Sequence, residues 1–167
     1  PPPALPRRQR QMCIRDRYPR GEGIGEKINE KPEIWEIGKA KLIREGSKVC
    51  ILSLGTRLKD SLVASEILAS YGLPTTVVDA RFAKPIDELL ITQLARDHEV
   101  LITVEEGSIG GFSAQVMSFL TKTGALDKGL KFRPIFFPDV FINHGKPEQQ
   151  NLSLLHISEP TRLASIA

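Results

Sequence analysis

Two hydrophobic periods alternate along the middle of the chain, and the switches between them predict an ordered series of strands and helices. Short apolar runs rich in Val and Ile, bounded by turn residues, predict strands at residues 48–54, 75–80, 99–104 and 132–137, after a first strand at 35–44. Apolar residues spaced three and four apart predict helices at 58–71, after Asp87, and after Gly110-Gly111.

The helix boundaries carry their own signals. Leu58 and Leu62 predict one buried stripe of the first helix, with Val63 and Ile67 beside it, and Gly72 suits a left-handed cap at its end. Asp87 opens the second helix, and Glu88 in its first turn suits the helix dipole. The third helix presents an apolar face made of Phe112, Val116, Phe119 and Leu120.

The order of elements predicts an α/β fold. We expect the first two strands to pair as a hairpin through the turn Glu45-Gly46-Ser47. Each later strand follows a helix long enough to return the chain for parallel pairing. The predicted product has three layers around a five-stranded mixed sheet, with four parallel strands, one antiparallel edge strand, and helices on both faces.

Both ends of the chain differ in composition from this body. Residues 1–16 are rich in Pro and Arg without an apolar period, which predicts disorder. The strings QMCIRDR and LSLLHISEPTRLASIA resemble translated sequencing-adapter DNA, so we interpret residues 1–16 and 151–167 as non-native tails. Residues 17–33 are interpreted as a linker and residues 34–150 as one domain.

Charge and composition exclude several classes of function. The first 20 residues hold six arginines against one aspartate, whereas the rest holds 17 basic and 19 acidic residues. The basic character therefore belongs to the N-terminal arm, and a body that binds nucleic acid loses its main support. No apolar run approaches the roughly 18 residues of a membrane span. The two cysteines suggest no disulfide framework and favour a reducing cytoplasm, and the absence of a Cys/His cluster argues against zinc.

Five strings occur in the order found in one family: RYPRG at residue 17, IGKAKLIREGSKV at 37, VDARFAKPID at 78, VEEGSIGG at 104 and PDVFINHG at 138. In this order they resemble 1-deoxy-D-xylulose-5-phosphate synthases, over their C-terminal, transketolase-C-type domain. The beta subunits of 2-oxo-acid dehydrogenases share this domain and remain an alternative, as does a free-standing α/β phosphate-binding module.

The resemblance implies a parent enzyme that uses thiamine diphosphate and Mg²⁺ to condense pyruvate with glyceraldehyde 3-phosphate, releasing CO₂, in isoprenoid, thiamine and pyridoxal precursor synthesis. It also implies a homodimer, in the cytoplasm or in a plastid, in which Phe136, Phe137, Val140 and Phe141 are candidate subunit contacts. The family's cofactor and metal segments are missing from this sequence. We therefore assign it no catalytic, cofactor-binding or metal-binding residue, and expect it to be inactive alone.

Arg20 is the one substrate-binding residue that we carry over from the family. The arginine of the YPRG string resembles a clamp on the phosphate of the acceptor substrate. A guanidinium suits this role because it binds two oxygens at once and stays charged.

The remaining polar candidates favour structural roles. Glu105 and Glu106 are expected to end a strand and accept hydrogen bonds from loops or a partner subunit, although paired carboxylates can act as acid and base. Gly110-Gly111 predicts a tight turn rather than an anion cradle. We further expect an ion-paired turn formed by Asp79, Arg81, Lys84 and Asp87. His98 and His144 are expected to be exposed, and Cys50 to pack in the core as a small apolar side chain.

Overall fold

The computed structural model describes residues 34–140, and the linker, both tails, Arg20, Phe141 and His144 lie outside this range. Its strands are β1 (Lys41–Arg44), β2 (Val49–Ser53), β3 (Thr75–Asp79), β4 (Val100–Ser108) and β5 (Lys131–Phe137). Its α-helices are α1 (Leu58–Ser70), α2 (Glu88–Asp97) and α3 (Phe112–Lys122), with short 3-10 turns η2 (Gly55–Arg57) and η3 (Ala125–Lys128).

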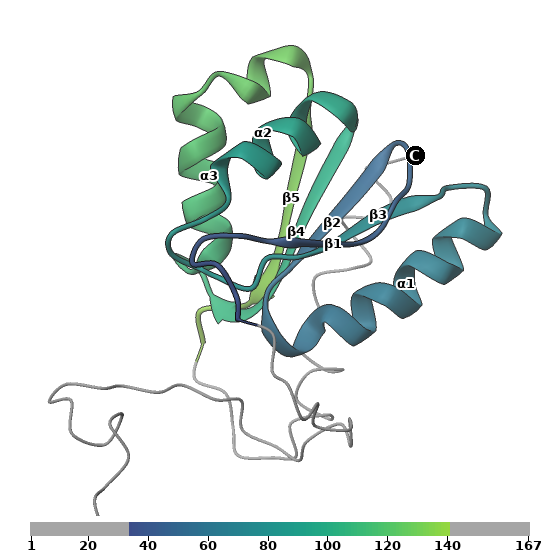
Figure 1. Cartoon of the computed structure of the whole chain (residues 1–167), viewed down its shortest axis with the longest axis horizontal. Helices are drawn as coiled ribbons and strands as arrows, with labels where there is room; N and C mark the ends of the chain where they lie inside the picture. Colours follow the sequence, from purple (N-terminus) through teal and green to yellow (C-terminus); the bar gives the residue numbers. More distant parts are fainter. Residues whose placement is uncertain (1–33, 141–167) are drawn as a thin grey trace, which may run out of the picture.

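The five strands form one mixed sheet in the order β1-β3-β2-β4-β5. β1 is antiparallel to β3 at one edge, and the pairs β3-β2, β2-β4 and β4-β5 are parallel. α1 lies on one face of the sheet, and α2 and α3 lie on the other (Figure 1). The predicted three-layer α/β architecture is therefore confirmed.

The main hydrophobic core lies between the sheet and the α2/α3 layer. Residues of β2, β4 and β5 that face this layer pack against the buried side of α3 and against Ile91 and Leu94 of α2. Phe112, Val116 and Leu120 are at most 2% exposed, as the spacing predicted, and Phe119 is half-buried. Cys50 is fully buried in this core, and burial raises the pKa of its thiol to about 12, which confirms its role as a small apolar side chain.

The structure confirms the residues predicted to start α2 and to end α1. Asp87 caps α2, because its Oδ1 accepts the Leu90 backbone N–H at 3.1 Å. Gly72 has a φ of +78°, the left-handed conformation expected after the last turn of α1.

The predicted hairpin is wrong, since β1 pairs with β3 and leaves β2 between β3 and β4. The turn after β1 passes across the start of β3. There the Gly46 N–H donates to Thr76 Oγ1 at 2.9 Å, and the Ser47 N–H donates to the Pro74 carbonyl at 3.0 Å. These bonds carry the chain past β3 before β2 begins. The strand predicted at 35–44 also begins too early, since β1 starts at Lys41 and residues 35–40 precede it.

The predicted apolar stripe of α1 is also placed differently. Val63 and Ile67 are 50% and 54% exposed, and the residues most buried against the sheet are Ser61 and Ser65. Both serine hydroxyls donate to backbone carbonyls of the preceding turn, at 2.8 and 2.7 Å. Because these bonds satisfy their polar atoms locally, small serines can be buried at the contact with the sheet.

Candidate functional site

The topology indicates where a ligand site would normally form in this fold. The connection after β2 leads to β3 on one side, and the connection after β4 leads to β5 on the other, so the topological switch point lies between β2 and β4. Open α/β sheets usually bind ligands in the crevice outside the carboxyl ends of such strands. In this chain η2 and the string VEEGSIGG meet at that place.

Glu105 occupies the start of α3 with its own carboxylate. The side chain belongs to a residue that is 4% exposed, and its Oε2 and Oε1 accept the backbone N–H groups of Phe112 and Ser113, each at 2.8 Å. The first N–H groups of a helix lack partners within the helix and attract anions. The chain therefore fills with its own carboxylate the position that a bound phosphate would take in a nucleotide-binding domain.

The glycines of VEEGSIGG make room for this carboxylate. A Cβ on Gly107 would lie 2.6 Å from Glu105 Oε2, and one on Gly111 would lie 2.3 Å from the same oxygen. Gly110 has a φ of +93°, which a side chain would strain. The predicted tight turn is confirmed, and Gly107 and Gly111 leave the room that the Glu105 carboxylate occupies.

Glu106 points to the other side of the sheet, as successive strand residues do. Its Oε1 accepts hydrogen bonds from Arg57 Nε at 3.0 Å and Nη2 at 2.7 Å, and Arg57 Nη1 reaches Asp60 at 2.7 Å. The Arg57 side chain is 14% exposed. This ion pair joins the loop after β2 to β4 across the switch point.

The two acidic residues therefore have the structural role that we favoured over a catalytic pair. They lie within β4 rather than at its end, because that strand continues to Ser108. They face opposite sides of the sheet, so they do not form a pair that shares a proton. Sequence reasoning missed Arg57, whose only signal was its place immediately after a predicted strand and turn.

The turn after β3 forms only part of the predicted ion-paired network. Arg81 Nε lies 3.9 Å from Asp79 Oδ2, and the Arg81 N–H donates to Asp79 Oδ1 at 3.1 Å. Asp87 serves instead as the helix cap and accepts the Ala40 N–H at 3.2 Å. No ion pair of Lys84 with a described residue is present.

His98 is half-buried, which corrects the prediction that it is exposed. Its Nδ1 lies 3.0 Å from the Leu94 carbonyl oxygen and its Nε2 lies 2.7 Å from Thr76 Oγ1. The ring links the end of α2 to the start of β3, at the end of the sheet where the parallel strands begin and opposite the switch point. His98 therefore stabilises the scaffold.

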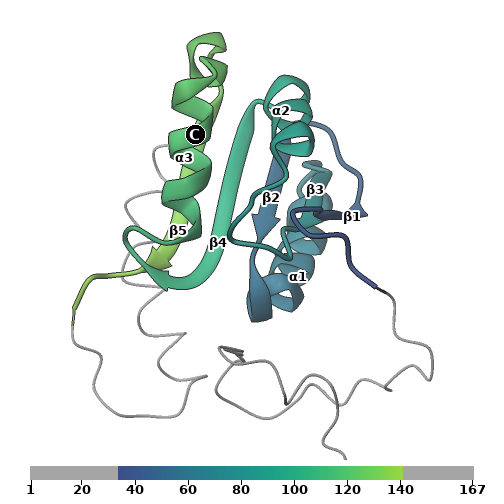
Figure 2. The ribbon, with the colours of Figure 1, turned by 60° about the vertical axis from the view of Figure 1, so that its left-hand side comes forward.

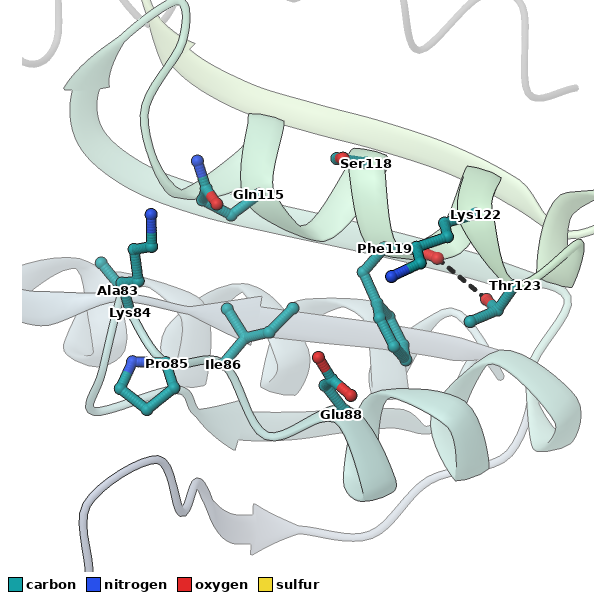
Figure 3. Close-up of a pocket in the computed structure, with 10 residues that line it drawn as sticks. All are labelled: Ala83, Lys84, Pro85, Ile86, Glu88, Gln115, Ser118, Phe119, Lys122 and Thr123. Atoms are coloured by element: carbon teal, nitrogen blue, oxygen red, sulfur yellow. Dashed lines mark hydrogen bonds between the residues drawn. The ribbon is translucent and has the colours of Figure 1, made fainter.

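A groove of about 390 Å³ lies between the loop before α2 and the exposed side of α3. Figure 3 shows Lys84 and Lys122 towards its two ends, with Ile86, Phe119 and Glu88 between them. Two ammonium groups suit an anion, but the Glu88 carboxylate shares the same open surface. None of the residues that line the groove is buried, so we assign it no ligand.

Metal binding and membrane insertion find no support in residues 34–140. No group of three His, Cys, Asp or Glu side chains in this range is arranged to hold a metal ion. No helix in the same range has the length and apolar character needed to cross a bilayer. Of the predicted subunit contacts, Val140 is 60% exposed, whereas Phe136 and Phe137 are half-buried.

Comparison with known proteins agrees with this architecture. A solved structure described as "Split gene transketolase, inactive beta4 tetramer" is 29% identical in sequence and superposes with a TM-score of 0.65. The match covers 72% of this chain but 38% of the other, so this chain spans well under half of that protein. The family "Transketolase, C-terminal domain" matches residues 38–159, most of this sequence. The chain therefore belongs to the transketolase C-terminal domain family.

Proposed function

We propose that the chain is the C-terminal domain of a thiamine-diphosphate-dependent 1-deoxy-D-xylulose-5-phosphate synthase. Membership of the transketolase C-terminal domain family supports the broader class of enzyme. The finer assignment rests on the combination of RYPRG with PDVFINHG at the two ends of the domain. In this proposal the complete enzyme condenses pyruvate with glyceraldehyde 3-phosphate, and two copies of the chain associate.

Our inference about the role of this domain rests on one observation: its own side chains occupy the topological switch point, where this fold usually binds a ligand. Glu105 already binds the N–H groups at the start of α3, and Arg57 already pairs with Glu106. The described residues thus offer no ready phosphate site at the place where this fold usually provides one. We infer that the domain acts as scaffold and subunit contact, and that Arg20, in the linker, binds the substrate phosphate.

The residues described here do not fit the cofactor. Thiamine diphosphate, where the complete enzyme holds it, would supply the electron sink for the decarboxylation of pyruvate. Its diphosphate needs a metal ion held by protein ligands, and residues 34–140 contain no suitable group of three side chains. In our proposal other domains of the parent enzyme hold the cofactor, and the 167-residue chain alone is inactive.

Substitution of Arg20 in the complete enzyme tests this proposal. Arg20→Ala should raise the KM for glyceraldehyde 3-phosphate by roughly 10- to 150-fold, which corresponds to about 1.5–3 kcal/mol for one lost charge-assisted contact. The KM for pyruvate should change little, because pyruvate carries no phosphate. Arg20→Lys is the matched control: it keeps the charge but loses two-point binding, so it should recover part of the loss.

Equal effects on the two substrates would remove Arg20 from the phosphate role. The control also separates charge from geometry. If Arg20→Lys is as impaired as Arg20→Ala, the planar fork is the essential feature. If it is fully active, a single positive charge is sufficient.

A transketolase is the second candidate, favoured by the 29% identity to the split-gene protein. The string IGKAKLIREGSKV fits a 2-oxo-acid dehydrogenase beta subunit equally well, but RYPRG and PDVFINHG are not expected in that class. Formation of 1-deoxy-D-xylulose 5-phosphate with CO₂ release from pyruvate by the complete enzyme would identify the synthase. Decarboxylation without this product would favour the dehydrogenase, and the absence of decarboxylation would favour a transketolase.

A further inference from the structure

The segment that leads into β1 lies against the loop that leads from β3 to α2. Figures 1 and 2 both show these two stretches side by side, although they are more than 40 residues apart in sequence. Contacts occur at several points between Trp35 and Ala40. The Arg81 guanidinium carbon lies 4.3 Å from the centroid of the Trp35 ring, and the Ala40 N–H donates to Asp87 Oδ2 at 3.2 Å.

Two further contacts lie between these. The Phe82 ring meets the Trp35 ring edge to face, with centroids 6.5 Å apart and planes at 75°. Gly38 has a φ of +76°, and a Cβ there would lie 3.0 Å from Pro85 Cγ. The segment therefore follows the loop closely enough that glycine is the residue that fits at its middle.

Arg81, which contacts Trp35, also has an unusual backbone conformation. Its φ is +56°, and it is the one residue other than glycine with positive φ in the described part of the chain. Such a conformation is costly for a residue with a side chain and persists where surrounding contacts enforce it. Here Asp79 accepts the Arg81 N–H at 3.1 Å, and the guanidinium is held under the indole with the side chain 9% exposed.

The same contact contributes little to the hydrophobic core. Trp35 is 49% exposed, and its neighbours Ile34 and Ile37 are 94% and 74% exposed. None of the three belongs to the core cluster. A tryptophan that is half in solvent but held by a guanidinium and a second aromatic ring is suited to fixing a chain direction rather than to burying area.

We propose that the loop from Arg81 to Asp87 is a docking seat for the chain entering the domain, and that Trp35 and Arg81 are positioning residues for the upstream linker. Arg20 precedes Ile34 by 14 residues in that linker. The catalytic consequence of this inference rests on the proposed function of Arg20, whereas the seat itself does not. The seat fixes the position and direction of the chain from Trp35 to Ala40, and in our proposal this constraint helps Arg20 to meet the substrate phosphate.

The seat itself is tested in the 167-residue chain, whose one tryptophan is Trp35. Arg81→Met should shift the emission of Trp35 and raise its quenching by acrylamide towards the value of the urea-unfolded chain. Arg81→Lys should fall between the wild type and Arg81→Met, because an ammonium contacts the ring face without the planar stacking of a guanidinium. Arg96→Met removes an exposed arginine at the end of α2 and should leave the fluorescence unchanged.

Far-UV circular dichroism shows whether each variant is folded. Unchanged quenching in a folded Arg81→Met protein would overturn the seat. If Arg81→Met does not fold, Arg81→Lys provides the test, and a quenching constant equal to that of the wild type would overturn the inference.

The consequence for catalysis is tested in the complete enzyme with Trp35→Ala. The KM for glyceraldehyde 3-phosphate should rise about 2- to 5-fold, the factor equivalent to one partly exposed cation–π contact, with kcat and the KM for pyruvate nearly unchanged. Trp35→Phe keeps a ring over the guanidinium and should restore most of the loss. A merely structural role would instead lower kcat or affect both substrates alike.

The double variant Arg20→Ala/Trp35→Ala links the two roles. If the seat acts through Arg20, Trp35→Ala should have no further effect on the KM for glyceraldehyde 3-phosphate once Arg20 is removed. Additive effects would overturn the coupling. If Arg20→Ala alone leaves this KM unchanged, the proposed role of Arg20 fails, whereas the fluorescence result still decides whether the seat exists.

Discussion

Replacement of Glu105 by glutamine is the sharpest test of how this domain fills its own switch point. The wild-type carboxylate accepts two backbone N–H groups at 2.8 Å each, in a residue that is 4% exposed. A glutamine of the same shape can accept one of them through its amide oxygen, but its NH₂ group then faces the other N–H. One charge-assisted bond is lost and a buried donor is left without a partner.

The magnitude follows from these contacts. A hydrogen bond to a charged group contributes about 1.5–3 kcal/mol. The loss of negative charge at the start of α3 adds roughly 0.3–1 kcal/mol. The free energy of unfolding should therefore fall by about 2–4 kcal/mol, out of a total of roughly 5–15 kcal/mol for a domain of this kind.

Urea unfolding followed by circular dichroism measures this change. With a slope of about 2 kcal/mol per molar urea, the middle of the range for small proteins, the midpoint should fall by roughly 1–2 M. Glu106→Gln is the matched control, since it makes the same chemical change at the next residue. Its side chain is 38% exposed and its partner is Arg57, so the loss should stay below about 1 kcal/mol. Equal losses at the two positions, or no loss at Glu105, would refute the assignment of Glu105 as the cap of α3.

Two other predictions concern stability and thiol chemistry. Gly46→Ala should cost roughly 1–3 kcal/mol in urea unfolding, because its Cβ would lie 2.3 Å from the Thr75 carbonyl carbon in backbone that is not free to move. Gly72→Ala, where φ is +78° but nothing lies within 4 Å, measures backbone strain alone, and an equally large loss there would contradict a steric origin at Gly46. In a Cys13→Ser variant, Cys50 should resist thiol reagents at pH 8 until urea is added, and rapid labelling of the folded chain would argue against its burial. Because burial raises the pKa of this thiol from 9.0 to about 12, its contribution to stability is complete below pH 9 and should be lost as the pH rises from about 9 towards 12.

Local sequence patterns were sufficient for most of the secondary structure. The apolar runs of β2, β3 and β5 and the face of α3 have periods that admit few alternatives, and the helix cap at Asp87 acts within four residues. Pairing of β1 was not predictable in this way. A short connection between two strands favours a hairpin, yet Gly46 packs on the backbone at the start of β3, and this contact between distant parts of the chain decides which strand β1 joins.

The features of the candidate site can also be separated into those predicted from the sequence and those that depend on the tertiary structure. The sequence by itself determined the α/β class, the motifs that relate the chain to its family, and a turn rich in glycine after β4. Only the tertiary structure decided that Glu105 binds the start of α3, that Arg57 reaches Glu106 from 49 residues away, and that Arg81 lies under Trp35. The physical reason is the sequence separation over which each kind of interaction acts. Propensity, periodicity and capping act over a few neighbouring residues, whereas a side chain finds a distant partner only after the sheet has fixed where each strand ends.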